Sequence, residues 1–166
     1  MEIVPTKTEY AASLDAAICS VAAEGVYLAG ETGLGAEEMR RFISDCLAGG
    51  YPQLLLVEGG SVLGWCDVVP DVRRGHGRLG IGLVRRVRGQ GWGERLMRAT
   101  LELAFRRFRV VELCVRAENA RAISLYRKLG FKAYNRRRPM PLGGIFTGKR
   151  LHMKLPRRTF LRGRTV

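Results

Sequence analysis

The chain has 166 residues, a hydrophobic content of 46% and a formal net charge of +14, from 29 Lys and Arg against 15 Asp and Glu. This length predicts one domain with its own core, and no apolar run approaches the ~20 residues that a membrane-spanning helix needs. The first residues lack a signal-peptide pattern, and four scattered cysteines with only two histidines argue against a zinc site. We therefore expect a cytoplasmic protein with reduced cysteines, no bound metal and no membrane contact.

The first fifty residues predict one strand and two helices. Residues 3–7 read as the strand, and a helix follows over residues 8–23, because apolar side chains recur there at helical spacing behind a capping Thr. A loop with four glycines occupies residues 24–35. The second helix covers residues 36–48, where a Gly-Gly pair ends it.

The middle of the chain predicts a hairpin and a third strand. Strands over residues 53–58 and 61–69 flank Gly59-Gly60, a two-residue hairpin signal. After a basic connector over residues 70–77, a β-rich run covers residues 79–87 and contains two interior glycines. Interior glycine marks a bulge or the close approach of another group, and we expect a ligand to lie alongside.

The remaining segments predict a parallel strand pair and a closing hairpin. An amphipathic helix from Trp92 to about Phe108 leads to a strand over residues 110–115, which implies a right-handed crossover between parallel strands. The other expected segments are a helix over 119–129, a strand over 131–135, a turn-rich stretch over 139–148, a strand over 151–155 and a basic, poorly ordered tail over 156–166.

The stretch between the β-rich run and the long helix has the features of an anion site. Arg88 is followed by glycines at 89, 91 and 93, directly before the helix. The first N–H groups of a helix lack internal partners and carry partial positive charge, and glycine lets a phosphate oxygen approach the backbone. The spacing is neither a Walker A motif, which needs Gly-Lys-Ser/Thr, nor the dinucleotide fingerprint.

Two motifs resemble the GNAT (GCN5-related) N-acetyltransferases. Arg88-x-x-Gly91-x-Gly93 is similar to the loop with which that family binds the pyrophosphate of acetyl-CoA. Residues 119–131 match the family segment Asn-x-x-Ala-x-x-Leu-Tyr-x-x-x-Gly-Phe at every named position. The resemblance covers roughly Glu2 to Leu155. It implies a single α/β (α+β) domain over residues 1–155, with a mixed twisted sheet of about six to seven strands, about four helices and a splayed parallel strand pair that binds CoA.

The resemblance also implies a set of site residues for acetyl-CoA. The backbone of Leu83 and Val84 would pair with pantetheine, and an N–H at or near Val84 would stabilise the oxyanion. Tyr126 would be the general acid, because its ordinary pKa near 10 suits a thiol leaving group. The expected cofactor contacts are Leu83, Val84, Arg88, Gly89, Gln90, Gly91, Trp92, Gly93, Asn119 and Tyr126, with Asn119 also able to cap a helix.

The general base stays open at this point. Many family members carry a Glu on the strand before the loop, but that strand has no carboxylate here. His76 has a suitable ordinary pKa and is our candidate. Asp67, Glu31 and a chain of water molecules without a dedicated base are the alternatives.

The implied activity is transfer of an acetyl group from acetyl-CoA to a primary amine. Because the chain is poor in acidic residues, we expect a small amino-acid-like or antibiotic-like acceptor rather than a polycation. One alternative is an N-terminal acetyltransferase of the ribosomal-protein type. A non-catalytic nucleic-acid-binding or ribosome-binding module and a CoA sensor are further alternatives, and a homodimer is common in this family.

The positive charge is concentrated near the C-terminus, where eleven basic residues and no acidic one follow from Lys132 onward. Such a surface attracts phosphates, nucleic acid or ribosomes. Arginine richness also follows from the codon usage of a GC-rich genome. The charge alone therefore does not choose a partner.

Overall fold

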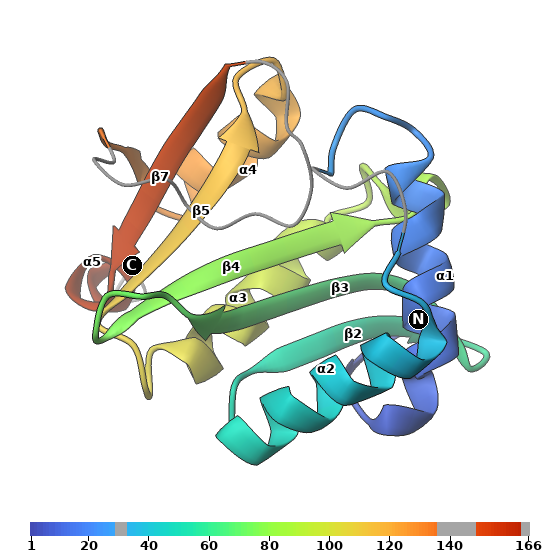
Figure 1. The fold of residues 1–166 in the computed structure, drawn as a ribbon. Helices are drawn as coiled ribbons and strands as arrows, with labels where there is room; N and C mark the ends of the chain where they lie inside the picture. Colours follow the sequence, from blue (N-terminus) through green and yellow to red (C-terminus); the bar gives the residue numbers. More distant parts are fainter. Residues whose placement is uncertain (29–32, 136–148, 164–166) are drawn as a thin grey trace.

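A seven-stranded twisted sheet runs through the described part of the chain, in the order β1-β2-β3-β4-β5-β7-β6 (Figure 1). The structure is a computed structural model that describes residues 1–28, 33–135 and 149–163. β4 and β5 are parallel, and the other neighbouring strands are antiparallel. This mixed sheet confirms the fold class that the sequence predicted.

The elements follow the predicted order and add one helix at the end. They are β1 (Glu2–Pro5), α1 (Ala11–Ala22), α2 (Ala36–Gly49), β2 (Gln53–Glu58), β3 (Ser61–Pro70), β4 (His76–Leu83), α3 (Trp92–Ala104), β5 (Val110–Arg116), α4 (Ala120–Lys128), β6 (Lys132–Ala133), β7 (Arg150–Pro156) and α5 (Arg157–Arg162). Short 3-10 turns precede α1 at Thr8–Tyr10 and follow β4 at Arg85–Val87.

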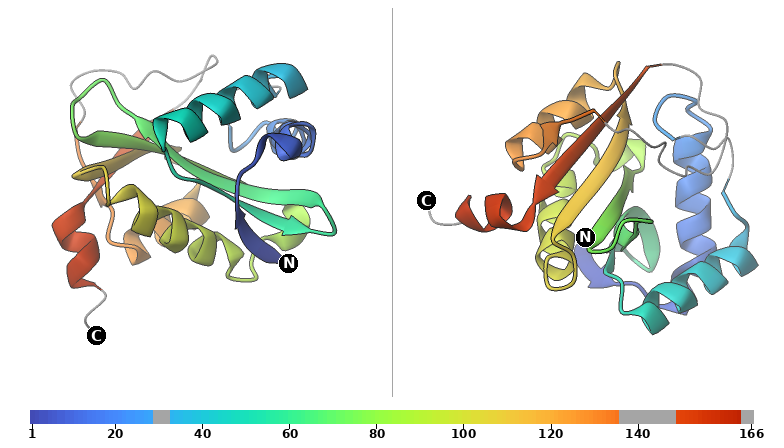
Figure 2. Two further views of the ribbon diagram at one scale, coloured as in Figure 1. Left: turned by 90° about the horizontal axis from the view of Figure 1, so that it is seen from below. Right: turned by 60° about the vertical axis from the view of Figure 1, so that its left-hand side comes forward.

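The sheet separates two hydrophobic layers. Helices α1 and α2 cover one face, called the front face here, and α3 and α4 cover the back face (Figures 1 and 2). Side chains alternate between the layers along each strand. On β2, for example, Leu54 and Leu56 join the back layer, whereas Leu55 and Val57 join the front layer.

Glycines end or turn several elements as the sequence predicted. Gly59 and Gly60 have φ angles of 55° and 78°, which suits the tight turn between β2 and β3. Gly50 ends α2 in the left-handed region with φ at 62°.

Three predicted boundaries are wrong. β4 covers residues 76–83 rather than 79–87, because its pairing with β3 starts at Gly77 and a 3-10 turn follows Leu83. α3 ends at Ala104 rather than near Phe108, although Phe105 and Phe108 are still buried in the core. β6 has only two residues, 132–133, because it pairs with β7 only there.

The predicted poorly ordered tail is also wrong for residues 157–162, which form α5. Phe160 lies in the core with its ring centroid 5.1 Å from that of Phe105. One buried aromatic side chain therefore anchors an otherwise basic segment. The predicted turn-rich stretch over residues 139–148 lies outside the described residues.

β4 and β5 separate soon after they meet. They pair only from His76 to Arg78 with Val110 to Glu112, whereas β5 stays paired with β7 along its whole length. We call the gap beyond this short pairing the wedge. This early separation confirms the predicted splayed parallel pair.

Among the described helices, none is long and apolar enough to cross a membrane.

Candidate active site

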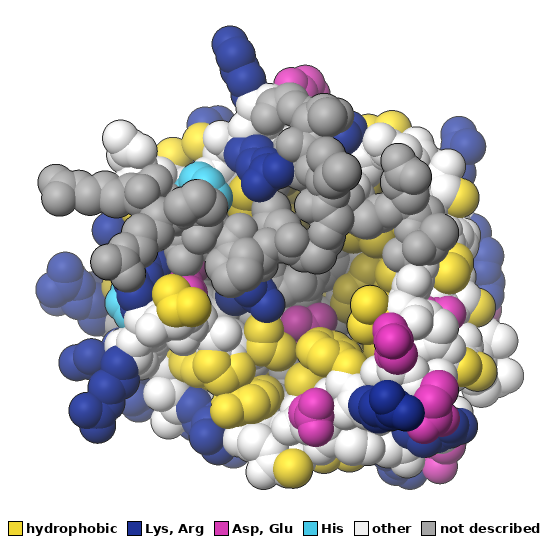
Figure 3. Space-filling view, in the orientation of Figure 1, with side chains coloured by type: hydrophobic (Ala, Val, Ile, Leu, Met, Phe, Trp, Pro, Cys, Tyr) yellow, Lys and Arg dark blue, Asp and Glu magenta, His cyan; other side chains and the backbone are white. Residues whose placement is uncertain are grey.

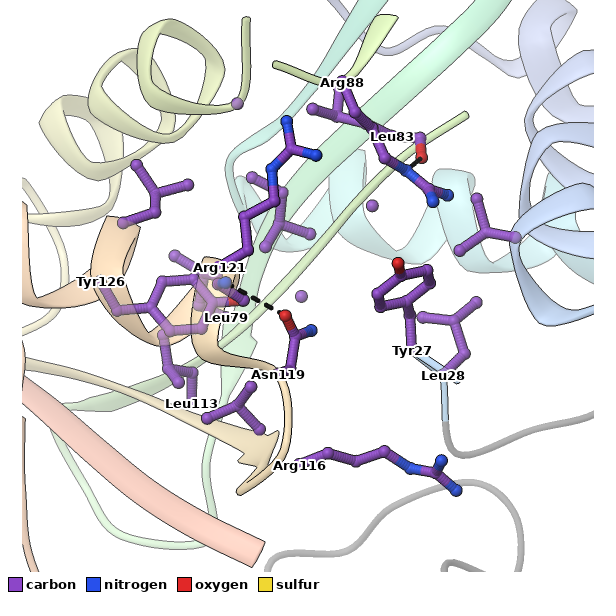
Figure 4. Close-up of a pocket in the computed structure, with 18 of the residues that line it drawn as sticks. Tyr27, Leu28, Leu79, Leu83, Arg88, Leu113, Arg116, Asn119, Arg121 and Tyr126 are labelled. Carbon is purple, nitrogen blue, oxygen red and sulfur yellow. Dashed lines mark hydrogen bonds between the residues drawn. The ribbon is translucent and has the colours of Figure 1, made fainter. Parts of the chain in front are cut away.

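A cavity of about 460 Å³ fills the wedge. Leu79, Leu113 and Tyr126 line it from the back layer, and Cys114 and Arg116 line it from the front face of β5. Because both faces of the strands contribute, the cavity passes through the sheet (Figure 4). Its front opening is completed by residues at the end of α1 and after it, which are Val21, Tyr27 and Leu28.

The backbone of β4 presents polar groups to the wedge. The Val84 N–H donates to the Leu63 carbonyl at 2.9 Å, and Leu83 lies opposite Gly64. In an antiparallel ladder this register turns the N–H and C=O groups of Leu83 and Ile81 away from β3 and toward the wedge. Sequence analysis named Leu83 and Val84, but the Val84 N–H is already bonded within the fold. Because alternate residues of a strand direct their backbone groups to the same side, Ile81 rather than Val84 joins Leu83 in facing the wedge.

The glycine-rich loop forms an open cradle at the start of α3. Gly89 and Gly91 both have φ at 83°, and a Cβ atom on Gly91 would meet nothing within 4 Å. The first helical hydrogen bond runs from the Arg95 N–H to the Gly91 carbonyl, so the preceding N–H groups have no partner within the helix. A phosphate could therefore approach both the glycines and the positive end of the helix.

The other predicted loop residues mainly hold the loop in place. The Gln90 side-chain amide donates to the Arg86 carbonyl at 2.9 Å. Trp92 is half-buried against the core, with the Arg95 guanidinium 5.1 Å from its ring centroid. Gly93 lets α3 lie close to β4, because a Cβ atom there would come within 3.2 Å of Leu83.

Arg88 connects the loop to the end of α1. Its Nη1 donates to Glu24 at 2.8 Å, its Nε donates to the Leu83 carbonyl at 2.8 Å, and its guanidinium lies 4.6 Å from the Tyr27 ring centroid. The hydrogen bond from Arg88 lowers the pKa of the Glu24 carboxyl below its ordinary value. Arg88 lines the cavity as predicted, but a carboxylate already neutralises its charge.

Arg121 is a cavity residue that sequence analysis missed. It comes from the first turn of α4 and is exposed, and its Nη2 lies 2.9 Å from the position that a Gly89 Cβ atom would take (Figure 4). Within the described structure no carboxylate pairs with it. Arg121 occupies a variable position of the 119–131 motif, so only the packing of α4 beside the loop reveals it.

The two motif residues on α4 both line the cavity. The Asn119 Oδ1 accepts from the Ala122 N–H at 3.1 Å, so Asn119 caps the helix. Tyr126 is 8% exposed, and its ring packs against Phe131. Burial raises the pKa of Tyr126 above its ordinary value, so the hydroxyl keeps its proton at neutral pH.

His76 lies at the paired end of β4 and is not a lining residue of the cavity. Its Nδ1 lies 2.8 Å from Glu112 Oε1, and Arg73 and Tyr134 donate to the other oxygen of the same carboxylate. We call these four residues the Glu112 cluster. The structure therefore does not bring His76 to the cavity, because the ion-pair cluster holds it at the other end of the strand. Glu31 lies outside the described residues.

Glu112 itself is completely buried. Burial works against its ionisation, but hydrogen bonds from Tyr134 and His76 and the charge of Arg73 lower the pKa of this carboxyl overall. The cluster joins β5, β4, the β3–β4 connection and the segment after β6. It holds together the closed end of the wedge.

The acetyltransferase (GNAT) family model matches residues 25–131, and these residues include the loop, the wedge and α4. The chain belongs to the GNAT family. GNAT enzymes use acetyl-CoA, so this protein is an acetyl-CoA-dependent N-acetyltransferase. The cavity suits that cosubstrate, because open N–H groups and Arg121 lie at one end and apolar walls follow the splayed strands.

Solved structures of this family share the fold. A ribosomal-protein-alanine N-acetyltransferase from Brucella melitensis is 21% identical, with a TM-score of 0.81 over 94% of this chain and 99% of that chain. A GNAT-family acetyltransferase from Streptococcus pneumoniae is 25% identical, with a TM-score of 0.80 over 93% and 98%. A phosphinothricin acetyltransferase from Sinorhizobium meliloti in complex with acetyl-CoA is 22% identical, with a TM-score of 0.78 over 93% and 87%. A search of curated protein sequences found no match.

Much of the positive charge of this GNAT enzyme lies away from the cavity. Figure 3 shows Lys and Arg side chains along the left edge, where Figure 1 places α5. The exposed arginines of the β3–β4 connection, the α3–β5 loop and α5 are Arg74, Arg106, Arg107, Arg109, Arg157, Arg158 and Arg162. The glycine-rich loop lies at the opposite end of β4. Cofactor binding therefore does not account for the positive charge along this edge. Nucleic-acid contact through it stays a prediction.

Proposed function

We propose that this enzyme acetylates the primary amine of a small, amino-acid-like molecule that carries an anionic group. The observation that carries this proposal is the front opening of the cavity. Arg116 lines this opening beside the uncharged Tyr27, Leu28 and Cys114. Arg88 also lies close to Tyr27, but its charge is paired with Glu24. Its Nη1 donates to the Gly25 carbonyl at 3.2 Å, which holds the guanidinium beside the opening (Figure 4). A guanidinium pairs well with a carboxylate or phosphinate, whereas a polyamine needs acidic partners.

The chemistry divides between the two faces of the sheet. The cradle and Arg121 bind the pyrophosphate, and Ile81 pairs with the pantetheine arm along β4. The amine enters from the front, and its lone pair attacks the thioester carbonyl carbon. The Leu83 N–H faces the wedge and stabilises the oxyanion. When the C–S bond breaks, Tyr126 gives its proton to the departing thiolate and regains one from the amine nitrogen.

Release of CoA thiol with a panel of acceptors tests the substrate class. We expect turnover with amino acids and their phosphinate analogues, and little with polyamines or aminoglycosides. Arg116→Ala raises the KM for anionic amines about tenfold, which corresponds to one charge-assisted hydrogen bond, and leaves neutral amines unaffected. Turnover restricted to polyamines would overturn the proposal.

Tyr126→Phe tests the general acid. Because proton donation contributes about 10²-fold or more, we expect kcat to fall by that factor. The acetyl-CoA Kd should stay within about twofold, since the ring is retained. An unchanged kcat would assign Tyr126 to packing alone.

A protein N-terminus is the second candidate acceptor, favoured by the exposed arginines around α5, which suit a ribosomal partner. Peptides with a free N-terminal amine belong in the same screen. Faster turnover of peptides than of free amino acids would favour this alternative. Tight acetyl-CoA binding with no turnover of any acceptor would indicate a CoA sensor or a binding module instead.

A further inference from the structure

Two glycines on β4 leave an opening on the front face beside the wedge. Gly82 lies opposite Trp65 of β3, and Gly80 lies opposite Asp67. A Cβ atom on Gly82 would lie 2.2 Å from Trp65 Cη2, and one on Gly80 would lie 3.3 Å from Asp67 Oδ2. The missing side chains therefore make room for two β3 side chains to lie across β4.

This arrangement brings a carboxylate to a strand that has none of its own. Gly80 and Gly82 both line the cavity, and the Asp67 carboxylate packs against Gly80 from behind, without being a lining residue itself. Asp67 lies on the front face, as do the cavity residues Cys114 and Arg116 and the opening through which the amine enters. Tyr126 approaches from the back face. The two proton-transfer groups thus lie on opposite sides of the sheet.

Asp67 is half-buried, and buried side chains lie beside it. Gln53 of β2 lies opposite it and is 7% exposed, and its side-chain amide has no hydrogen bond to any described residue. Cys46 of α2 and Cys66 of β3 are both buried near the carboxylate, and Arg78 is the neighbouring cation. Burial raises the pKa of Asp67 to about 7, although the charge of Arg78 works in the opposite direction.

We propose that Asp67 is the general base of this enzyme, supplied from β3 across the glycine opening in β4. This inference rests on the proposed transfer to an amine. The Asp67 carboxylate takes one proton from the ammonium group of the acceptor, directly or through a water molecule. The freed lone pair forms the C–N bond, and the C–S bond then breaks. The second amine proton reaches the thiolate by way of Tyr126, and Asp67 releases its proton to solvent.

Asp67 must be ionised to act, so its pKa sets an acid limit on the rate. For the wild-type protein, log(kcat/KM) rises with pH below about 7 and levels off above it. The Asp67→Asn protein must bind an amine that is already neutral. The rising part of its pH–rate profile, called the acid limb here, therefore moves toward the higher pKa of the free amine. We expect kcat/KM at pH 7 to fall about 100-fold.

The experiment measures CoA release from full-length protein with the standard amino acids as probes, and acetyl-CoA hydrolysis without an acceptor. The acetyl-CoA Kd of Asp67→Asn stays within twofold of wild type. Asp45→Asn, which removes an exposed carboxylate on α2, is the matched control and changes nothing. Gly80→Ala is a second variant: its methyl group would press on the Asp67 oxygens, and several-fold slower turnover is expected with unchanged cofactor binding.

The outcomes separate the base from the acceptor class. If Asp67→Asn keeps the wild-type rate and acid limb, or loses acetyl-CoA binding, the assignment is wrong. If no amino acid turns over but acetyl-CoA hydrolysis depends on Asp67 and shows the same acid limb, the proposed acceptor class is wrong and the assignment of Asp67 as the base is supported. If neither reaction depends on Asp67, the base assignment fails whatever the acceptor.

Discussion

The two ends of the β4–β5 pair place polar groups in opposite situations. At the closed end, the buried Glu112 carboxylate accepts hydrogen bonds from Arg73, His76 and Tyr134. At the open end, Leu83 and Ile81 turn backbone groups into a cavity. Satisfied buried groups fix a structure, whereas groups that the fold leaves facing a cavity can bind a ligand. The comparison teaches that the closed end supplies rigidity and the open end supplies the site.

Glu112→Ala tests the closed end and has the largest expected effect. Breaking a buried ion pair costs about 3–5 kcal/mol, and we expect about 3 because the Arg73 side chain is 41% exposed. Urea unfolding measures the loss. Glu118→Ala, an exposed residue that follows the same strand, should stay within about 0.5 kcal/mol of wild type. If acetyl-CoA affinity falls as much as stability, the two ends are not separate in function.

Gly91→Asp tests the open end. A side chain is strained at φ of 83°, and a carboxylate there repels phosphate. We expect acetyl-CoA binding to weaken about 100-fold, so that the stabilisation by ligand at a hundred times the wild-type Kd falls from about 2.7 to about 0.4 kcal/mol. Gly59→Asp introduces the same side chain at another positive φ angle, in the β2–β3 turn. Acetyl-CoA should still stabilise this control variant against thermal unfolding. If both variants lose that stabilisation, general backbone strain rather than the loop explains the effect.

Arg121→Ala sharpens the same comparison with a smaller effect. Removing one guanidinium from the cradle should weaken acetyl-CoA about tenfold, near 1.4 kcal/mol, and the loss should shrink at high salt. Arg127→Ala removes an exposed arginine from the same helix and serves as the control. Titration calorimetry at two salt concentrations measures both. Equal effects in the two variants would mean that only the overall charge matters.

Much of the fold was predictable from local patterns. The Gly59-Gly60 hairpin, the end of α2 at Gly50 and the glycine-rich start of α3 depend on residues close together in the chain. The poorest predictions concern segments whose structure depends on distant partners. α5 forms because Phe160 packs against Phe105, and β4 ends early because a 3-10 turn follows Leu83.

The sequence by itself determined the family, the element order and the location of the glycine-rich loop, because helix starts, tight turns and motif spacings are local properties. Only the tertiary structure decided which charged groups belong to the site. It paired Arg88 with Glu24, joined His76 to Glu112, brought Arg121 to Gly89 and placed Asp67 over Gly80. Each of these contacts joins residues at least 13 positions apart, so no local pattern could reveal them. The role of a charged side chain follows from the partner that the fold provides.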